Sequence, residues 1–361
     1  MEAAESLLLT PGPVRIPAEV MAAIARPPLH QRTPEFEEFW REMQPRMQYL
    51  FQTLGPTLLV PGSGTTGMEM TMRSLFPPGA KVAIQDTGKF SARWVAYGRR
   101  LGWEVVPVRA PWFETVTLAQ VRDVVAAHPD LAGWVLTQVE TSTGMAIDLE
   151  EIAFFLRGEA PETLIVVDAI CSVGIQALYQ DAWGLDAVVA ASQKGLANPA
   201  GCCLVGLSER AVAHLTPSDK HDGLHLAAFY EYGQRGSYPF TPPVQLMYGL
   251  DAALRTLQSE GLPARWIAIQ ARAQWFRGEL KRLGATQANP PHGAGVTAFY
   301  FAGRDNEQLR EQLRTVHGII VANGQEAFRG KRLRVGHFGD VGQPEMERLV
   351  EALEMELNKL K

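Results

Sequence analysis

Two charged side chains follow short apolar runs in the middle of the chain. Asp168 comes directly after the apolar residues 164–167, and Lys194 comes shortly after the apolar run 187–191. Runs of this length, rich in Val, Ile and Ala, are typical of buried strands. The carboxyl ends of parallel strands meet at one edge of a sheet, where ligands bind, so we expect both side chains there. A lysine and an acid suit a cofactor that forms a Schiff base with an amine and pairs its ring nitrogen with a carboxylate, as pyridoxal phosphate does.

A glycine-rich stretch, Gly62-Ser-Gly-Thr-Thr-Gly67, lies between an expected strand, residues 57–60, and an expected helix, residues 66–75. The free backbone N–H groups of a helix N-terminus could bind a phosphate there. The same stretch satisfies the pattern G-x-G-x-x-G, and Asp86 ends the next expected strand, close to the spacing of a dinucleotide site. An NAD(P)-dependent oxidoreductase that uses Gly62–Gly67 and Asp86 is therefore an alternative, although it leaves the acid–lysine pair without a task.

Three further positions could contribute to a site. Phe90 follows an expected strand and could stack on a flat ring, although the residue by itself favours a core aromatic. Thr141 follows another expected strand, where a ligand-binding edge and simple turn or N-cap chemistry are equally compatible with its polar neighbours. Arg334 lies between apolar residues of an expected strand and could bind a carboxylate through two parallel hydrogen bonds, or could face solvent.

The acid, the lysine and a pair of histidines also have simpler interpretations. Asp168 could be a helix N-cap or part of a structural ion pair, and Lys194 could be a surface lysine in a loop. His221 and His225 are four residues apart, a spacing that binds metals on helices. Asp222-Gly223 breaks the helical pattern between them, so we expect a polar loop and no metal site.

Apolar runs alternate with amphipathic stretches along the first two thirds of the chain. This alternation predicts an α/β fold with a mainly parallel sheet sandwiched by helices. Near residue 256 the pattern changes to that of a smaller α+β unit. We expect an N-terminal extended segment, residues 1–18, that contributes to the cleft or the small domain. A large cofactor-binding domain, residues 19–256, and a small C-terminal domain, residues 257–361, would follow.

The individual elements are expected at the following residues. The strands are 57–60, 81–85, 104–108, 134–138, 164–167, 187–190 and 202–205, then 296–301, 319–322 and 332–335. The helices are 66–75, 91–101, 118–127, 149–156, 242–258 and 264–283, then 305–316 and 345–360.

The composition is that of an ordinary globular protein, with 46% hydrophobic and 20% charged residues among 361. The net charge of -5 argues against a nucleic-acid partner. The acidic N-terminus carries too short an apolar run for a signal peptide, and no stretch approaches the ~20 apolar residues of a membrane span. The cysteines show no disulfide or zinc spacing. We therefore expect a cytoplasmic protein.

Taken together, these features resemble the class V aminotransferases, which are pyridoxal-phosphate enzymes of fold type I. Within that family the chain is most similar to the branch of alanine–glyoxylate, serine–glyoxylate and serine–pyruvate aminotransferases. The resemblance covers nearly the whole chain and rests on the order and spacing of short motifs. These are Thr10-Pro-Gly-Pro, His30-Gln-Arg-Thr-Pro-Glu-Phe, Gly62-Ser-Gly-Thr, Glu140-Thr-Ser-Thr-Gly, Val167-Asp-Ala, Ser192-Gln-Lys-Gly, Tyr238-Pro-Phe-Thr-Pro-Pro and Leu333-Arg-Val-Gly.

The resemblance implies a role for each matching position. Lys194 would form the Schiff base with pyridoxal phosphate and later move a proton, Asp168 would pair with the ring nitrogen, and Arg334 would bind the substrate carboxylate. The remaining roles are phosphate binding by Ser63, Gly64, Thr65 and Gln193, stacking by Phe90, contact with the ring O3' side by Thr141, proximity to the substrate for Gly12, and contact with the phosphate of the neighbouring subunit by Tyr238 and Thr241. The last two imply a homodimer with shared active sites.

The implied reaction is ping-pong transamination from a small amino acid, serine or alanine, to a 2-oxo acid such as glyoxylate or pyruvate. A 2-aminoethylphosphonate–pyruvate or aspartate-type aminotransferase on the same fold is the alternative. Phe90 and Thr65 stand where the family often has tryptophan and can have histidine, which leaves the amino donor open. A cysteine desulfurase is set aside, because glutamine rather than histidine precedes Lys194 and no cysteine follows Cys203.

Overall fold

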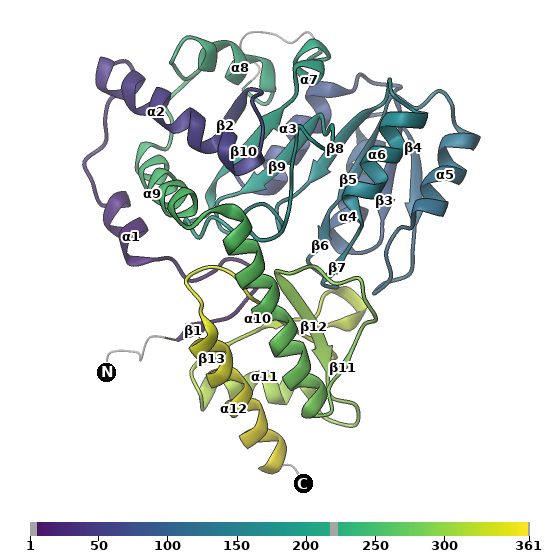
Figure 1. Cartoon of the computed structure of the whole chain (residues 1–361), viewed down its shortest axis with the longest axis vertical. Coiled ribbons are helices and arrows are strands. Elements are labelled where there is room, and N and C mark those ends of the chain that lie inside the picture. Colours follow the sequence, from purple (N-terminus) through teal and green to yellow (C-terminus); the bar gives the residue numbers. More distant parts are fainter. Residues whose placement is uncertain (1–5, 217–222, 360–361) are drawn as a thin grey trace.

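The computed structural model describes residues 6–216 and 223–359. Within them, a seven-stranded sheet has the order β2-β10-β9-β8-β5-β3-β4 and is packed against helices (Figure 1). β10 runs antiparallel to both of its neighbours, and the other adjacent pairs are parallel. The expected α/β fold with a mainly parallel sheet is therefore confirmed. The strands are β2 (Thr57–Gly62), β3 (Lys81–Asp86), β4 (Glu104–Arg109), β5 (Gly133–Thr137), β8 (Leu164–Asp168), β9 (Ala187–Ala191) and β10 (Gly201–Leu207).

Apart from the helix that begins at Lys89 after Gly88, the described helices packed around this sheet begin at polar caps or prolines. Thr117 and Asp148 cap two helices that begin at the predicted residues, Leu118 and Leu149, by accepting hydrogen bonds from backbone N–H groups in the first turn. A short hairpin, β6 (Val139–Glu140) and β7 (Met145–Ala146), follows β5. The helices are α1 (Ala18–Ile24), α2 (Pro34–Phe51), α3 (Gly64–Leu75), α4 (Lys89–Arg100), α5 (Leu118–Ala127), α6 (Leu149–Glu159), α7 (Glu209–Ala213), α8 (Leu226–Gln234) and α9 (Val244–Glu260).

The helices α1, α2, α7 and α8 were not predicted from the apolar pattern of the sequence. In α2 the buried residues Phe36, Trp40, Met43, Met47 and Leu50 recur at helical spacing, but Pro45 lies inside the helix and obscures the signal. His225, expected in a polar loop, is instead the buried N-cap of α8, where its Nδ1 accepts from the backbone N–H of Ala227. His221 lies outside the described residues.

The C-terminal part of the chain forms a second, smaller core around a four-stranded antiparallel sheet with the order β11-β12-β15-β14. α9 packs in the large core, the chain turns at Gly261, and the end of α10 packs in the small core. The division of the chain near residue 256 stays a prediction. The elements are α10 (Leu262–Arg282), β11 (Thr286–Gln287), β12 (Val296–Tyr300), α11 (Asn306–Thr315), β13 (Ile319–Ile320), β14 (Ala322–Asn323), a 3-10 helix (Glu326–Phe328), β15 (Leu333–Gly336) and α12 (Gln343–Lys359).

The N-terminal segment is attached to this smaller core. Its strand β1 (Leu7–Leu8) pairs in parallel with β13, and the two lie side by side in Figure 1. On the other side, the N–H of Gly336 donates to the carbonyl of Leu9 at 2.9 Å. The segment then runs on through Pro11 and Gly12 towards the large sheet, so it links the C-terminal part of the chain to the region of Lys194.

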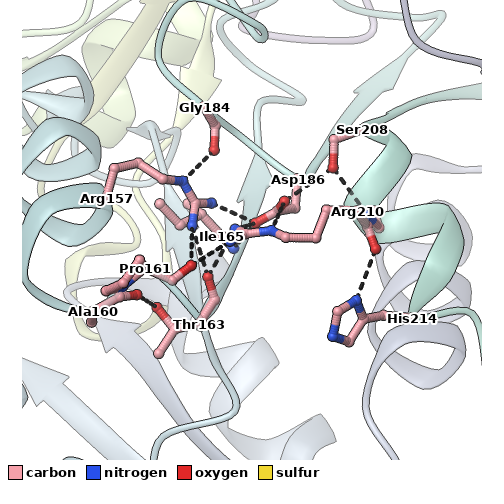
Figure 2. Close-up of polar contacts among 11 residues, drawn as sticks. Arg157, Ala160, Pro161, Thr163, Ile165, Gly184, Asp186, Ser208, Arg210 and His214 are labelled. Atoms are coloured by element: carbon pink, nitrogen blue, oxygen red, sulfur yellow. Dashed lines mark hydrogen bonds and ion pairs between the residues drawn. The ribbon is translucent and has the colours of Figure 1, made fainter.

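An ionic cluster around the buried carboxylate of Asp186, shown in Figure 2, joins the strands at the end of the sheet opposite to Asp168 and Lys194. Asp186, directly before β9, accepts hydrogen bonds from Arg157 at 2.5 Å, from Arg210 at 2.6 Å and from the N–H of Ile165 in β8 at 2.7 Å. Ser208, directly after β10, donates to the same carboxylate at 3.0 Å. The cluster therefore fixes three adjacent strands relative to one another, and two of them carry the residues of the site.

No helix among the described residues is both long and apolar enough to cross a bilayer.

Candidate active site

A cavity of about 230 Å³ lies at the carboxyl ends of the parallel strands. It brings together residues far apart in the sequence, because these strand ends converge at one edge of the sheet. Nine of the expected site residues line it: Gly12, Ser63, Gly64, Thr65, Phe90, Thr141, Asp168, Gln193 and Lys194. Four residues that the sequence did not single out line it as well: Arg93, Trp94, Val139 and Ile170.

Lys194 lies in a tight turn after β9. The turn requires Gly195, because a Cβ there would lie 2.3 Å from the carbonyl oxygen of Val173. Nζ of Lys194 donates to the carbonyl of Pro11 at 2.5 Å. Gly12, whose φ is +110°, packs so closely that a Cβ would lie 2.4 Å from Cδ of the lysine. The N-terminal segment thus covers the amine directly.

The pKa of Lys194 is lowered, mainly because burial disfavours its charged form. The guanidinium of Arg334 lowers the pKa further, whereas the carboxylate of Asp168 opposes the shift. A lowered pKa increases the share of neutral amine, which is the nucleophilic form of lysine.

Asp168, the last residue of β8, is buried and receives one hydrogen bond on each oxygen. Nε1 of Trp94 donates to Oδ2 at 2.8 Å, and the N–H of Ile170 donates to Oδ1 at 3.0 Å. Burial raises its pKa to about 6, although the two donors act in the opposite direction. A cation at this position would favour the ionised form and offset the cost of burying the charge.

The glycine-rich stretch forms the N-terminus of α3. Ser63 caps the helix through a reciprocal pair of hydrogen bonds with Thr66. Within the described residues, the backbone N–H groups of Gly64 and Thr65 donate to no protein acceptor. Gly67 allows α3 to pack closely on the sheet, because a Cβ there would lie 1.9 Å from Sγ of Cys203. The helix N-terminus can therefore offer free donors to an anion at the cavity.

The first turn of α4 is held by Glu140, which lies in a predicted motif but to which the sequence assigned no role of its own. Its buried carboxylate accepts from the N–H of Phe90 at 3.1 Å and from the N–H of Ser91 at 2.9 Å. It also accepts from the hydroxyl and the N–H of Ser142. This contact orients Phe90, which is half-buried and lines the cavity, so the expectation of a core aromatic is wrong.

Arg334 lies on β15 and is 5% exposed. Its Nη1 donates to the carbonyl of Thr141 and its Nε to the carbonyl of Asn323, both at 2.9 Å. Burial lowers its pKa to about 10, so the side chain remains a cation at neutral pH. The alternative of a solvent-facing arginine is therefore wrong.

Comparison with known proteins is consistent with this geometry. The family model described as Aminotransferase class-V matches residues 18–338. The chain belongs to the class V aminotransferases. It is therefore an enzyme that transfers amino groups and uses pyridoxal phosphate.

Three similar proteins illustrate the range of the family resemblance. The "Soluble hydrogenase, small subunit" of Synechococcus sp. (strain PCC 6716) is 32% identical over 99% of this chain and 94% of the relative. Its printed name refers to a different activity, and the family match decides the activity of this chain. "Alanine--glyoxylate aminotransferase 1" of Saccharomyces cerevisiae is 30% identical, over 92% of this chain and 91% of the relative. A crystal structure of an aspartate aminotransferase of subgroup IV from Thermus thermophilus has a TM-score of 0.91 and 30% identity, and covers 98% of this chain and 99% of that chain.

The cavity fits the cofactor of the class V aminotransferases. The start of α3 with its free N–H groups lines the cavity, together with the Asp168 carboxylate, the Lys194 amine and an aromatic side chain. The buried Oε1 of Gln193 has no hydrogen-bond partner within the described residues, which leaves this amide available to a ligand. The chemistry of this donor set matches an anionic phosphate, a ring nitrogen and an aldehyde.

The dinucleotide alternative is wrong. β2, which precedes the glycine stretch, lies at the edge of the sheet and is antiparallel to β10. A dinucleotide-binding glycine motif instead follows a strand inside a parallel sheet, at the point where the strand order reverses. The carboxylate of Asp86 forms an ion pair with Arg109 at 3.2 Å. The family membership of the chain assigns it a different cofactor.

Three expected site residues do not line the cavity: Arg334, which contacts the lining residue Thr141, and also Tyr238 and Thr241. Tyr238 is 2% exposed, and its hydroxyl donates to the carbonyl of Leu59 at 2.8 Å. Thr241 is exposed, and its hydroxyl lies 3.5 Å from the amide nitrogen of Gln31. Their role at a second subunit stays a prediction.

Among the described residues, no group of three or more His, Cys, Asp and Glu side chains is arranged to hold a metal ion.

Proposed function

We propose that this aminotransferase moves an amino group from a small amino acid, serine or alanine, to a 2-oxo acid such as glyoxylate or pyruvate. The proposal rests on the close contact between the N-terminal segment and the side chain of Lys194. The carbonyl of Pro11 and the backbone of Gly12 lie against its side chain. This leaves little room beside the amine, so short amino-acid side chains fit best.

Lys194 and Asp168 perform the central chemistry in this proposal. Bound pyridoxal phosphate supplies an electron-withdrawing ring that lowers the pKa of the substrate Cα–H. Nζ of Lys194 would hold the cofactor covalently, and the same amine would serve as the general base for the substrate Cα proton. Its lowered pKa supports this role. Asp168 pairs with the ring nitrogen and keeps it protonated, and the two hydrogen bonds to its oxygens support this orientation.

In this proposal the start of α3 holds the cofactor phosphate. The free N–H groups at the start of α3 support phosphate binding by this helix end. The half-buried ring of Phe90, which lines the cavity, supports stacking on the cofactor. The residues that would bind the phosphate are Ser63, Gly64, Thr65 and Gln193, and Thr141 would line the O3' side of the ring.

Arg334 binds the substrate carboxylate in this proposal. Two of its nitrogens are held by backbone carbonyls, so the guanidinium is oriented before substrate arrives. Nη2 makes no hydrogen bond to a described residue and is the group offered to the substrate. Preorganised, charge-assisted hydrogen bonds of this kind are stronger than those of a mobile side chain.

The yeast relative's printed name supports alanine as donor and glyoxylate as acceptor. Aspartate is the second candidate donor, since the similar Thermus protein is an aspartate aminotransferase. We also propose a cytoplasmic homodimer in which Tyr238 and Thr241 contact the neighbouring phosphate. The three free cysteines, Cys171, Cys202 and Cys203, are buried and support a reducing compartment.

The test is a visible-absorption titration of the purified holoenzyme with serine, alanine and aspartate, one at a time. A true donor should convert the cofactor's absorption band without any oxo acid present, and glyoxylate or pyruvate should restore it. Lys194→Ala should abolish borohydride-trapped attachment of the cofactor. Conversion by aspartate alone would replace the small-donor proposal, and retained trapping in the variant would show that another lysine forms the bond.

A further inference from the structure

One cation in the cavity has no role in the function described so far. Arg93 lies on α4, one turn after Phe90, and lines the cavity. Its Nη1 donates to the hydroxyl oxygen of Thr65 at 2.7 Å, across 28 residues of sequence. Its Cζ lies 5.4 Å from the centre of the Phe90 ring. The side chain therefore spans from the ring-stacking residue to the N-terminus of α3.

Arg93 differs from the basic residues around it. Lys89 forms an ion pair with Glu326, Arg100 with Glu69 and Arg109 with Asp86. Within the described part of the chain, Arg93 makes no ion pair. A half-buried guanidinium beside a ligand cavity, with a neutral hydroxyl as its protein partner, is available to an anion.

The charges of the cavity show which anion this is. Three lining residues are charged: Asp168, Lys194 and Arg93. Asp168 is assigned to the ring nitrogen, and Lys194 is consumed in the covalent bond to the cofactor. The donors assigned to the phosphate are hydroxyl, amide and backbone groups, which carry no net charge. A phosphate carries about -1.5 to -2 at neutral pH, so it needs a cation.

We propose that Arg93 is the cation that neutralises the cofactor phosphate, and that it does so partly by orienting Thr65. Because Oγ1 of Thr65 accepts from Arg93, the hydroxyl proton is free to point elsewhere and donates to the phosphate. The inference rests on the proposed position of the phosphate at the start of α3.

The experiment compares the affinities of the cofactor-stripped enzyme for pyridoxal phosphate and for pyridoxal, which lacks the phosphate. Arg93→Met should weaken pyridoxal phosphate binding about 10- to 100-fold, as expected for hydrogen bonds to a charged group, and leave pyridoxal binding unchanged. Arg93→Lys should restore part of the loss. Arg99→Met, an exposed position on the last turn of the same helix, is the matched control and should change neither affinity. Thermal unfolding of each variant checks that the fold is kept.

Thr65→Val separates failure of this inference from failure of the proposed site. If Thr65→Val lowers the preference for the phosphorylated form but Arg93→Met does not, the phosphate site stands and the role of Arg93 is overturned. If neither changes the preference, the phosphate position itself is wrong. Equal loss of both ligands in Arg93→Met would show a structural effect, and a higher KM for aspartate with unchanged cofactor affinity would make Arg93 a substrate residue. Each of these last two results also overturns the proposal.

Discussion

Asp168 should make the stability of the cofactor-free protein depend on pH in an unusual direction. Burial raises its pKa from 3.8 to about 6 in the folded state. Between these two values the folded chain binds more protons than the unfolded chain, so the free energy of unfolding falls as the pH rises. A difference of about two pKa units corresponds to about 3 kcal/mol in total, of which 1 to 2 kcal/mol, roughly half, is lost between pH 5 and pH 8.

Asp168→Asn isolates this contribution, because asparagine has nearly the same shape and does not titrate. Its amide cannot accept the hydrogen bonds of both Trp94 and Ile170, so the variant is shifted by a constant amount at every pH. The informative quantity is therefore the difference between wild type and variant as a function of pH. Urea unfolding of both cofactor-stripped proteins, followed by circular dichroism from about pH 5 to about pH 8, measures it.

The expected result is a wild type that loses about 1 to 2 kcal/mol relative to the variant over this range. Adding pyridoxal phosphate should remove the dependence, since a protonated ring nitrogen favours the ionised carboxylate. A difference that stays constant with pH in the cofactor-free proteins would refute the reasoning, because it would mean that burial does not raise the pKa of Asp168.

Three further results are expected. Arg334→Gln should lower kcat/KM for amino-acid donors by about 10- to 100-fold, measured in the donor half-reaction, because charge-assisted hydrogen bonds to the substrate are lost. The affinity for the cofactor should stay unchanged, and an equal loss of cofactor affinity would argue against a substrate role. Asp186→Ala should lower the free energy of unfolding, measured by urea unfolding, by about 3–5 kcal/mol, because it leaves Arg157 and Arg210 without their buried partner (Figure 2). A loss below about 1 kcal/mol would contradict this expectation. Trp94→Phe removes a donor that lowers the pKa of Asp168, so the pH-dependent loss of stability described above should move to higher pH; a shift to lower pH would count against the Trp94 contact.

The local pattern of the chain was sufficient for most elements of the large sheet. The helix expected at residues 118–127 has those bounds, and the strands that carry Asp168 and Lys194 were placed to within one residue. These segments can be predicted from the sequence because their apolar residues and capping residues are neighbours along the chain. α2 was missed because the exposed Pro45 lies inside it and argues locally against a helix, and its helical state depends on contacts with the core.

Sequence and tertiary structure thus determined different parts of this protein. The sequence by itself was enough to predict the sheet, the family, the cofactor and nine cavity residues, because each follows a strand end or lies in a local motif. Only the tertiary structure brought Trp94 to Asp168, Glu140 to the start of α4 and Arg93 to Thr65. These contacts join residues 28 to 74 positions apart, and no local pattern records which side chains meet across such distances. The physical reason is that the carboxyl ends of parallel strands always lie at the same edge of the sheet. Which helix side chains contact the residues at that edge depends on how the helices pack on the core.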